Sequence, residues 1–314
     1  MLDHLVEKKQ SQMKRKAGSD RAILRGHGEA PTFNFSADSK HLASISAEGL
    51  VAVWDVETGK RVWDVKTDKQ EWEIKSDENS LVPLIFYSPD NKYLFYLTGN
   101  EEVHVRHAAT GVLFTKLNVN MRSDTARFLF PGYKDEIIVV GESRMELRRL
   151  ATGKFIRAIK YPCGPVEEMR VQCKDKLMID NSGRVMTFAG KQVGQLEDFA
   201  SDWLTISPDG KRVAAEGSEY RSIEVWDVES GKSVSEFKDG HSSLVSCGAY
   251  SADGKFFASG SSDMTVIVWN VETGKRVAVH EYGMGFVNDV KFSPDGKFLA
   301  IGYEDGSIVL VARE

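Results

Sequence analysis

The chain has 314 residues, of which 41% are hydrophobic and 28% are charged, as is usual for a globular protein. Its formal net charge of −5 at pH 7 argues against a nucleic-acid-binding surface over the whole chain. No apolar run approaches the roughly 18 residues of a membrane span, and the first residues lack the apolar core of a secretory signal. We therefore expect neither nucleic acid nor membrane as a partner.

Cysteine usage points to a reducing compartment. The three cysteines, Cys163, Cys173 and Cys247, are odd in number and lie far apart in the sequence. Zinc and redox motifs need cysteines or histidines at close, regular spacing, and this chain has none of these spacings. We therefore expect a cytoplasmic protein with reduced thiols, no metal site and no cofactor.

Residues 1–18 form a basic leader on an otherwise acidic chain. The segment carries five cations, which are Lys8, Lys9, Lys14, Arg15 and Lys16. Its four apolar residues are at helical spacing, and they are Leu2, Leu5, Val6 and Met13. Such a segment can dock a partner helix, an anionic membrane or a nucleic acid. A frayed, solvated leader is the simpler interpretation. We expect a helical or disordered leader, followed by a single folded domain over 19–314.

One eight-residue pattern recurs along the folded part. Val-Trp-Asp-Val-Glu-Thr-Gly-Lys at 53–60 returns with small changes at 225–232 and 268–275, and weaker copies lie at 106–112 and 148–154. Trp226 and Trp269 are 43 residues apart, and Trp54 and Trp226 are 172 apart, which is four times 43. A period of this length with a Trp-Asp pair predicts a β-propeller with one blade per repeat.

Each repeat is predicted to form four strands separated by turns of the Ser-Pro-Asp-Gly and Glu-Thr-Gly-Lys types. Blades three and four are degenerate, and the fourth, which has no Trp, is placed from spacing alone. The fold class is therefore all-β, a seven-bladed propeller. Its blades are expected at 30–66, 80–119, 123–160, 164–197, 200–238, 242–281 and 285–314.

The last blade lacks an outer strand, because only three residues follow the strand that ends near Val311. Residues 19–25 precede Gly26-His27 as residues 233–238 precede Gly240-His241, and the latter segment is an outer strand. We therefore expect the N-terminal strand to complete the last blade. Closure of the ring removes unpaired strand edges.

These motifs resemble the WD-repeat β-propeller family over residues 19–314, most fully in blade six. The resemblance implies a hydrogen-bonded structural tetrad in that blade, formed by His241, Ser259, Asp263 and Trp269. His, Ser and Asp together also suggest a catalytic triad. The structural interpretation is preferred, because the trio recurs at the repeat spacing and would be buried within a blade.

Other blades depart from the tetrad. Blade one has His27, Ser44 and Trp54, but Glu48 stands where Asp is expected. Arg106 and Arg148 stand at the Trp positions of blades two and three, and blade seven has Val311 there.

The resemblance implies a non-catalytic scaffold or adaptor that binds a protein or peptide on its loop face, alone or as a subunit of a larger complex. An insertion of about ten residues, judged against the repeat period, carries Trp72 in a charged setting. Trp72 is a candidate partner-binding anchor. The alternative is that it packs on its own blade or extends the outer strand.

Four arginines from different blades are expected on the same face: Arg122, Arg144, Arg184 and Arg221. Together they could hold an acidic or phosphorylated ligand through charge-assisted hydrogen bonds. The alternative is that neighbouring Asp124, Glu142 and Glu219 neutralise them.

The competing functional class is a propeller enzyme, hydrolase- or lactonase-like, with its site at the central channel. Such a site needs acidic, basic or metal-binding residues that converge on the axis. The equivalent inner-strand positions hold a mixed set, namely Asn34, Ile85, Thr205, Ala249 and Lys291. We therefore expect no catalytic residues.

Overall fold

The computed structural model describes the chain in segments that include nearly all of blades one, two, six and seven. The described residues are 20–66, 84–97, 102–118, 127–129, 136–140, 145–149, 154–159, 172–174, 177–179, 182–187, 191–199, 201, 203–217 and 221–313.

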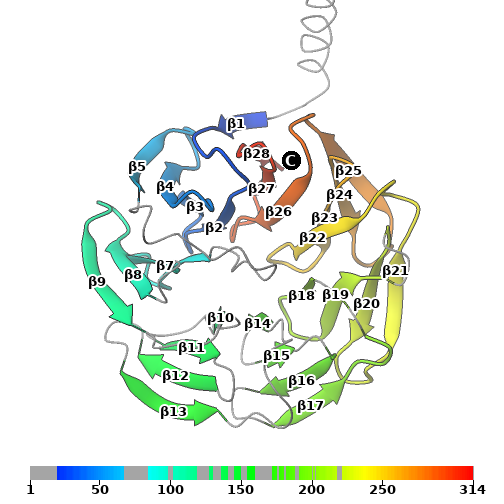
Figure 1. The fold of residues 1–314 in the computed structure, drawn as a ribbon. Helices are drawn as coiled ribbons and strands as arrows, with labels where there is room; N and C mark the ends of the chain where they lie inside the picture. The colour runs from blue at the N-terminus through cyan, green and yellow to red at the C-terminus, as the bar shows by residue number, and fades with distance from the viewer. Residues whose placement is uncertain are drawn as a thin grey trace, which may run out of the picture.

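These residues form seven four-stranded antiparallel sheets arranged in a ring, with one edge strand of each sheet near the centre and the other at the rim (Figure 1). The first four sheets correspond to the predicted blades one to four. Their strands are β2 (Thr32–Phe35), β3 (His41–Ile45), β4 (Leu50–Asp55) and β5 (Arg61–Lys66); β6 (Ile85–Tyr87), β7 (Tyr93–Leu97), β8 (Glu102–His107) and β9 (Leu113–Asn118); β10 (Arg127–Leu129), β11 (Glu136–Val140), β12 (Met145–Arg149) and β13 (Phe155–Ile159); β14 (Gln172–Lys174), β15 (Leu177–Ile179), β16 (Arg184–Thr187) and β17 (Gln192–Gln195).

The remaining three sheets are blades five, six and seven. Their strands are β18 (Leu204–Ile206), β19 (Arg212–Glu216), β20 (Ile223–Asp227) and β21 (Ser233–Phe237); β22 (Val245–Tyr250), β23 (Phe256–Ser261), β24 (Thr265–Asn270) and β25 (Arg276–Glu281); β26 (Val287–Phe292), β27 (Phe298–Tyr303), β28 (Ile308–Ala312) and β1 (Asp20–Leu24). The all-β, seven-bladed prediction is confirmed, including the degenerate fourth blade.

The ring closes through β1, as expected from the incomplete last blade. β1 pairs antiparallel with β28, with Leu24 opposite Ile308 and Ala22 opposite Leu310. Leu24 is 1% exposed and packs in a core cluster that joins blade seven to blade one. The two ends of the folded chain are therefore held together by backbone pairing and by apolar burial.

Serine–aspartate turns join the first and second strands of blades one, two, five, six and seven. In blade two, Ser88 Oγ donates to Asp90 Oδ1 at 2.6 Å and accepts from Tyr93 N at 2.9 Å. The hydrogen bond from Ser88 holds the pKa of Asp90 below its ordinary value.

Two of these turns also link neighbouring blades. Ser39 and Asn91 adopt φ values of 61° and 59° at positions where later blades carry Gly. In both cases the strained residue accepts a hydrogen bond from a neighbouring blade. Asn91 Oδ1 accepts from Ala37 N of blade one at 2.7 Å, and Ser39 Oγ accepts from Asp295 N of blade seven at 3.0 Å.

Small residues in the second strands allow the blades to pack closely. A Cβ added at Gly260 would lie 2.4 Å from Val287 Cγ1, and one added at Gly302 would lie 2.6 Å from Phe33 Cε1. In both places a fully buried side chain from the next inner strand fills the space. The core of the protein therefore lies between blades as well as within them.

Candidate functional site

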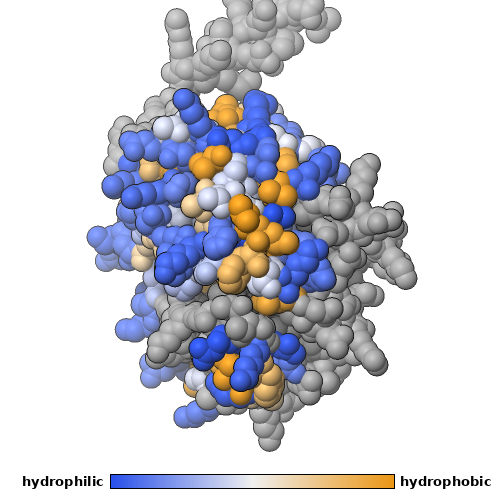
Figure 2. Space-filling view, turned by 90° about the vertical axis from the view of Figure 1, so that its left-hand side faces the viewer, coloured by the Kyte–Doolittle hydropathy of each residue, from blue (hydrophilic) through white to orange (hydrophobic). Residues whose placement is uncertain are grey.

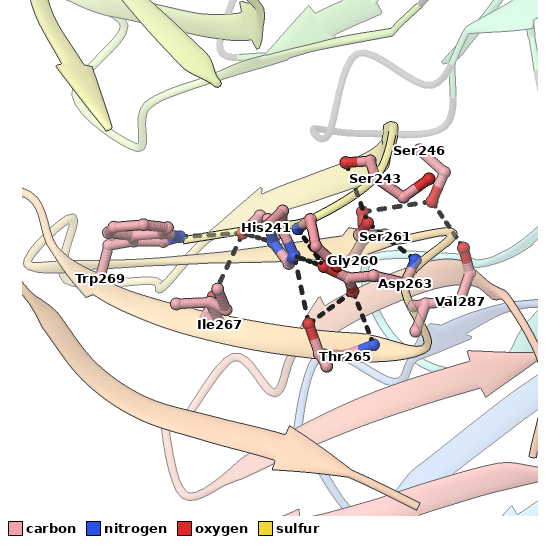
Figure 3. A network of polar contacts seen from close by, with 12 residues as sticks. His241, Ser243, Ser246, Gly260, Ser261, Asp263, Thr265, Ile267, Trp269 and Val287 are labelled. Carbon is pink, nitrogen blue, oxygen red and sulfur yellow. Dashed lines mark hydrogen bonds and ion pairs between the residues drawn. The ribbon is translucent and has the colours of Figure 1, made fainter. Parts of the chain in front are cut away.

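A buried polar network in blade six joins the four side chains of the expected tetrad (Figure 3). Trp269 Nε1 donates to Ser259 Oγ at 2.8 Å, and Ser259 Oγ lies 2.7 Å from His241 Nε2. His241 Nδ1 lies 3.1 Å from Asp263 Oδ2. The chain of contacts runs from β24, through β23, to the loop before β22 and the β23–β24 turn.

Burial sets the protonation states of this network. It lowers the pKa of His241 despite the opposing effect of Asp263, so the imidazole is neutral at pH 7. Burial alone would raise the pKa of Asp263, but hydrogen bonds from Thr265 and Ser242 hold it below its ordinary value. His241 therefore donates from Nδ1 to a carboxylate and accepts the Ser259 hydroxyl at Nε2.

Asp263 also shapes the loop face, which we define as the face formed by the β23–β24 turn and its equivalents together with the loops between blades. Its Oδ2 accepts from Ser242 N at 2.8 Å, and its Oδ1 accepts from Thr265 N at 3.0 Å and Thr265 Oγ1 at 2.6 Å. One carboxylate thus fixes the inter-blade loop and the adjacent turn. A satisfied network of this kind makes the local backbone rigid.

The same network argues against a Ser-His-Asp active site. Ser259 is 0% exposed, and its oxygen already accepts the indole N–H of Trp269. A substrate carbonyl has no approach to a hydroxyl in this position. The arrangement can hold a blade and two loops together, and that is the chemistry it supports.

Blade one contains three members of the set. Trp54 Nε1 donates to Ser44 Oγ at 2.8 Å, and Ser44 Oγ lies 2.7 Å from His27 Nε2. Glu48 is exposed, and its carboxylate lies over Gly28. Burial, followed by the nearby positive charge of Arg61, lowers the pKa of His27 to about 4.

Blade two replaces the indole–hydroxyl pair by another pair that sequence analysis missed. Arg106 stands at the Trp position, and its Nε donates to Tyr96 OH at 2.6 Å while Nη1 donates to Gly111 O at 2.9 Å. Strand register places Tyr96 opposite His104, as Ser44 is opposite Ala52 in blade one. The substitution of Arg for Trp was visible in the sequence, but its tyrosine partner could be identified only from the register.

Blades three and five show two further solutions. Arg148 binds Glu146 Oε2 through Nε at 2.9 Å and Nη2 at 2.7 Å. Blade five keeps Trp226 but has Ala215 at the Ser position, and the indole donates to Glu197 O at 3.2 Å instead.

The expected partner-binding residues are only partly described. Trp72, Arg122 and Arg144 lie outside the described residues. Arg184 begins β16, with Nε donating to Ser182 Oγ at 2.9 Å, and Arg221 is exposed in the turn before β20. Arg184 directly follows the second-to-third-strand turn of blade four, and Arg221 lies in that of blade five, so both are on the loop face. Whether these residues bind a partner stays a prediction.

Three exposed apolar side chains on the loop face were not anticipated from the sequence. Leu244, Met264 and Phe286 are 44%, 40% and 44% exposed. Single apolar residues in loops carry no periodic signal, which explains why the sequence pattern did not single them out. Exposed apolar groups that lie close together mark interaction surfaces more often than scattered ones do.

The rim carries exposed apolar residues of a different kind. Figure 2 looks at the rim from the side of β5 and β9 and shows hydrophobic residues within a mostly hydrophilic surface. The exposed valines Val62, Val193, Val234 and Val277 all lie on outer strands. Because they recur from blade to blade, these residues belong to the repeat and do not single out one site.

Polar groups near the axis are engaged with one another. Asn34 Nδ2 donates to Ile85 O at 2.8 Å across blades one and two, and Lys291 Nζ lies 3.2 Å from Asp289 Oδ1. Burial raises the pKa of Cys247 to about 12, so its thiol is protonated and is a poor nucleophile at pH 7.

Within the described segments, no group of three or more His, Cys, Asp and Glu side chains converges to hold a metal ion. The described part of the chain likewise contains no helix long and apolar enough to cross a bilayer.

Comparisons with known proteins agree with the architecture. The family "WD domain, G-beta repeat" (WD40) matches residues 231–270 and 275–311. Pre-mRNA-processing factor 19 of Oryza sativa subsp. japonica is 26% identical over 198 residues, which cover 57% of this chain and 37% of that protein. The chain therefore aligns with little more than a third of that relative. The family match shows WD40 repeats at residues 231–270 and 275–311, and the seven four-stranded sheets agree with that repeat architecture.

Proposed function

We propose that the chain is a non-catalytic scaffold that binds a protein or peptide partner on its loop face. WD40 domains generally serve as protein-interaction platforms. The observation that carries the proposal is the combination found in blade six. Asp263 fixes the backbone of the loop face, while Leu244 and Met264 beside it stay exposed. Rigid loops that display apolar side chains bind at low entropic cost.

A catalytic role has less support. The hydroxyl of Ser259 is buried and bonded to an indole, and the thiol of Cys247 is protonated. A hydrolase- or lactonase-like activity would need an acid, a base or a nucleophile that a substrate can reach. Ser259 and His241 instead hold blade six and its loops together. Hydrolysis of a lactone by the purified chain, above a heat-denatured control, would reverse this proposal.

The relative from rice supports a finer proposal. By its name, that protein is a pre-mRNA-processing factor. We extend the scaffold proposal to membership of a larger assembly, which native mass spectrometry of the tagged chain purified from its own cells would test. We also propose a cytoplasmic location, to be tested with a fluorescent fusion of the chain.

We propose a partner of different chemistry for the part of the loop face that blades four and five form. Arg184 and Arg221 lie on the arc of blades four and five. An acidic or phosphorylated ligand on that arc remains a proposal, and its other expected residues, Trp72, Arg122 and Arg144, lie outside the described part of the chain.

Site-specific photo-crosslinking tests the face directly. A photoreactive residue placed at exposed Ser242 of the loop face is expected to crosslink partner protein in cells. Matched positions are Glu272, in the turn on the opposite face, and Val234 on the rim. Equal crosslinking from all three positions, or crosslinking only from Glu272, would contradict the proposal.

A further inference from the structure

Met264 occupies a left-handed backbone conformation that is strained for a residue with a side chain. In the turn between the second and third strands, blades one and seven place Gly49 and Gly306 at φ values of 79° and 86°. Blade six places Met264 at the same point, with φ 70°. All three residues donate the same hydrogen bond to the residue three positions earlier. A side chain in the left-handed region is strained, and such strain concentrates at functional positions.

The methionine side chain does not enter the core. It is 40% exposed, and of the five non-glycine residues at positive φ in the described part of the chain, Met264 is the one apolar residue. Met264 therefore keeps a strained backbone in order to display a flexible apolar group on the loop face. Methionine is well suited to binding surfaces because its side chain adapts to the partner.

Leu244 and Phe286 are further exposed apolar residues of the loop face, just before the inner strands of blades six and seven. Leu244 lies next to the turn of Met264, because its carbonyl oxygen accepts from Ser262 N at 2.9 Å. Leu244 and Phe286 each precede the inner strand of their blade, and these strands are tied by the Ser246 Oγ–Val287 O hydrogen bond of 2.6 Å (Figure 3). We call Leu244, Met264 and Phe286 the loop-face patch.

Exposed carboxylates outnumber cations on the loops that carry and adjoin the loop-face patch. On the described loops and turns of the loop face in blades six, seven and one, five acidic side chains are exposed: Asp239, Glu304, Asp305, Glu29 and Glu48. The cations in the same loops are Lys238, which pairs with Glu236 at 2.7 Å, and Arg25, and both directly follow outer strands. The two histidines, His27 and His241, have lowered pKa values and are neutral at pH 7.

We infer that the loop-face patch binds a basic segment of a partner protein that presents apolar side chains to Leu244, Met264 and Phe286. The inference rests on the proposed function and specifies the partner's chemistry. Lysines and arginines of the segment would face the exposed carboxylates of these loops, which gives orientation and faster association. Anionic lipid and nucleic acid are repelled by the same carboxylates.

Selection from a displayed library of random peptides tests the inference. The library is panned on the wild-type chain, and enriched peptides are titrated against variants. We expect peptides that combine Lys or Arg with large apolar residues. Binding should weaken at least about tenfold in Leu244→Ser/Phe286→Ser, in line with the loss of apolar anchors. The rim variant Val234→Ser/Val277→Ser is the matched control and should bind as the wild type does.

The charges need their own variant. Glu29→Gln/Glu48→Gln/Glu304→Gln should weaken binding severalfold and reduce its salt dependence. The opposite-face variant Glu57→Gln/Glu229→Gln/Glu272→Gln, whose residues are equally exposed, should leave binding unchanged. Circular dichroism melting of every variant verifies that the ring is intact.

The other outcomes overturn the inference and separate it from the proposed function. Enrichment of acidic peptides, or basic peptides that bind Leu244→Ser/Phe286→Ser as tightly as the wild type, would overturn it. If peptides of either kind no longer bind to Arg184→Ala/Arg221→Ala, they occupy another part of the loop face. The loop face then still binds partners, and the proposed function stands. If no enriched peptide depends on any loop-face residue, both proposals fail.

Discussion

His27 Nε2 lies 2.7 Å from Ser44 Oγ, whereas Nδ1 of the same ring is buried and has no hydrogen-bond partner among the described residues. In blade six the equivalent nitrogen of His241 faces Asp263 at 3.1 Å. The two blades differ because Glu48 stands at the Asp position of blade one, and its longer side chain lies over Gly28.

Glu48→Asp should therefore complete the network of blade one. The shorter carboxylate can accept from His27 Nδ1, and we expect a gain of about 1 kcal/mol in the free energy of unfolding, the usual contribution of a buried hydrogen bond. Urea unfolding measures the gain. Glu48→Ala is the control, since it removes the carboxylate without offering an acceptor. If the two variants are equally stable, the proposed hydrogen bond does not form.

The lowered pKa of His27 predicts a loss of stability in mild acid. Burial, and then Arg61, shift this pKa from 6.5 to about 4. As the pH falls below 6.5, the unfolded chain takes up a proton that the folded chain does not bind. Stability present above pH 6.5 is therefore lost progressively as the pH falls toward 4, by about 2 kcal/mol at about pH 5. Unfolding of His27→Gln between about pH 7 and 5 should show a smaller loss by about this amount. Equal losses in both proteins would contradict the pKa assignment.

Burial of Leu24 in strand β1 should contribute strongly to the free energy of unfolding of the closed ring. Leu24 is 1% exposed in the cluster between blades seven and one, and its neighbour Ile23 is 45% exposed. Leu24→Ala should lower the free energy of unfolding by about 2–4 kcal/mol, because it leaves a cavity at the closure. Ile23→Ala, on the same strand, should cost less than about 1 kcal/mol. Thermal melting compares the two, and similar melting temperatures would argue against closure by β1.

Replacement of His241 should lower the stability of the protein and should cause no change in enzymatic assays. His241→Ala removes the bridge between Ser259 and Asp263, and we expect a loss of about 1–3 kcal/mol for the buried partners left unpaired. Ser242→Ala, whose side chain is exposed next to it, should stay within about 0.5 kcal/mol of the wild type. A fully stable His241→Ala protein would show that the network contributes no stability.

Sequence analysis could predict whatever the repeat dictates. Turn chemistry and the regular Trp positions identified seven blades, and the missing outer strand after Val311 identified closure by the N-terminal strand. The tetrad of blade six could be assigned residue by residue, because this blade has the expected residue type at every position of the repeat motif. Blade four was found from spacing alone, because about two repeat lengths separate Arg148 from Trp226.

The unpredicted features depend on register and on backbone angles. The pairing of Arg106 with Tyr96 required the strand register, and the orphaned nitrogen of His27 required knowing where the side chain of Glu48 points. In the sequence Met264 is an ordinary turn residue. Its φ of 70° shows that it has the same left-handed conformation as Gly49 and Gly306 at the equivalent positions of other blades. Such features lie in three-dimensional placement, which a pattern of residue types does not contain.

Met264→Gly provides the most direct measurement, because it separates folding from binding in one residue. Glycine relieves the strain at φ 70° but gains freedom in the unfolded chain, and because these effects oppose each other the free energy of unfolding should change by less than about 0.5 kcal/mol. Binding of a selected basic peptide, measured by calorimetric titration on the same sample, should weaken about tenfold or more. Unchanged peptide affinity at unchanged stability would contradict a binding role for the loop face of blades six and seven.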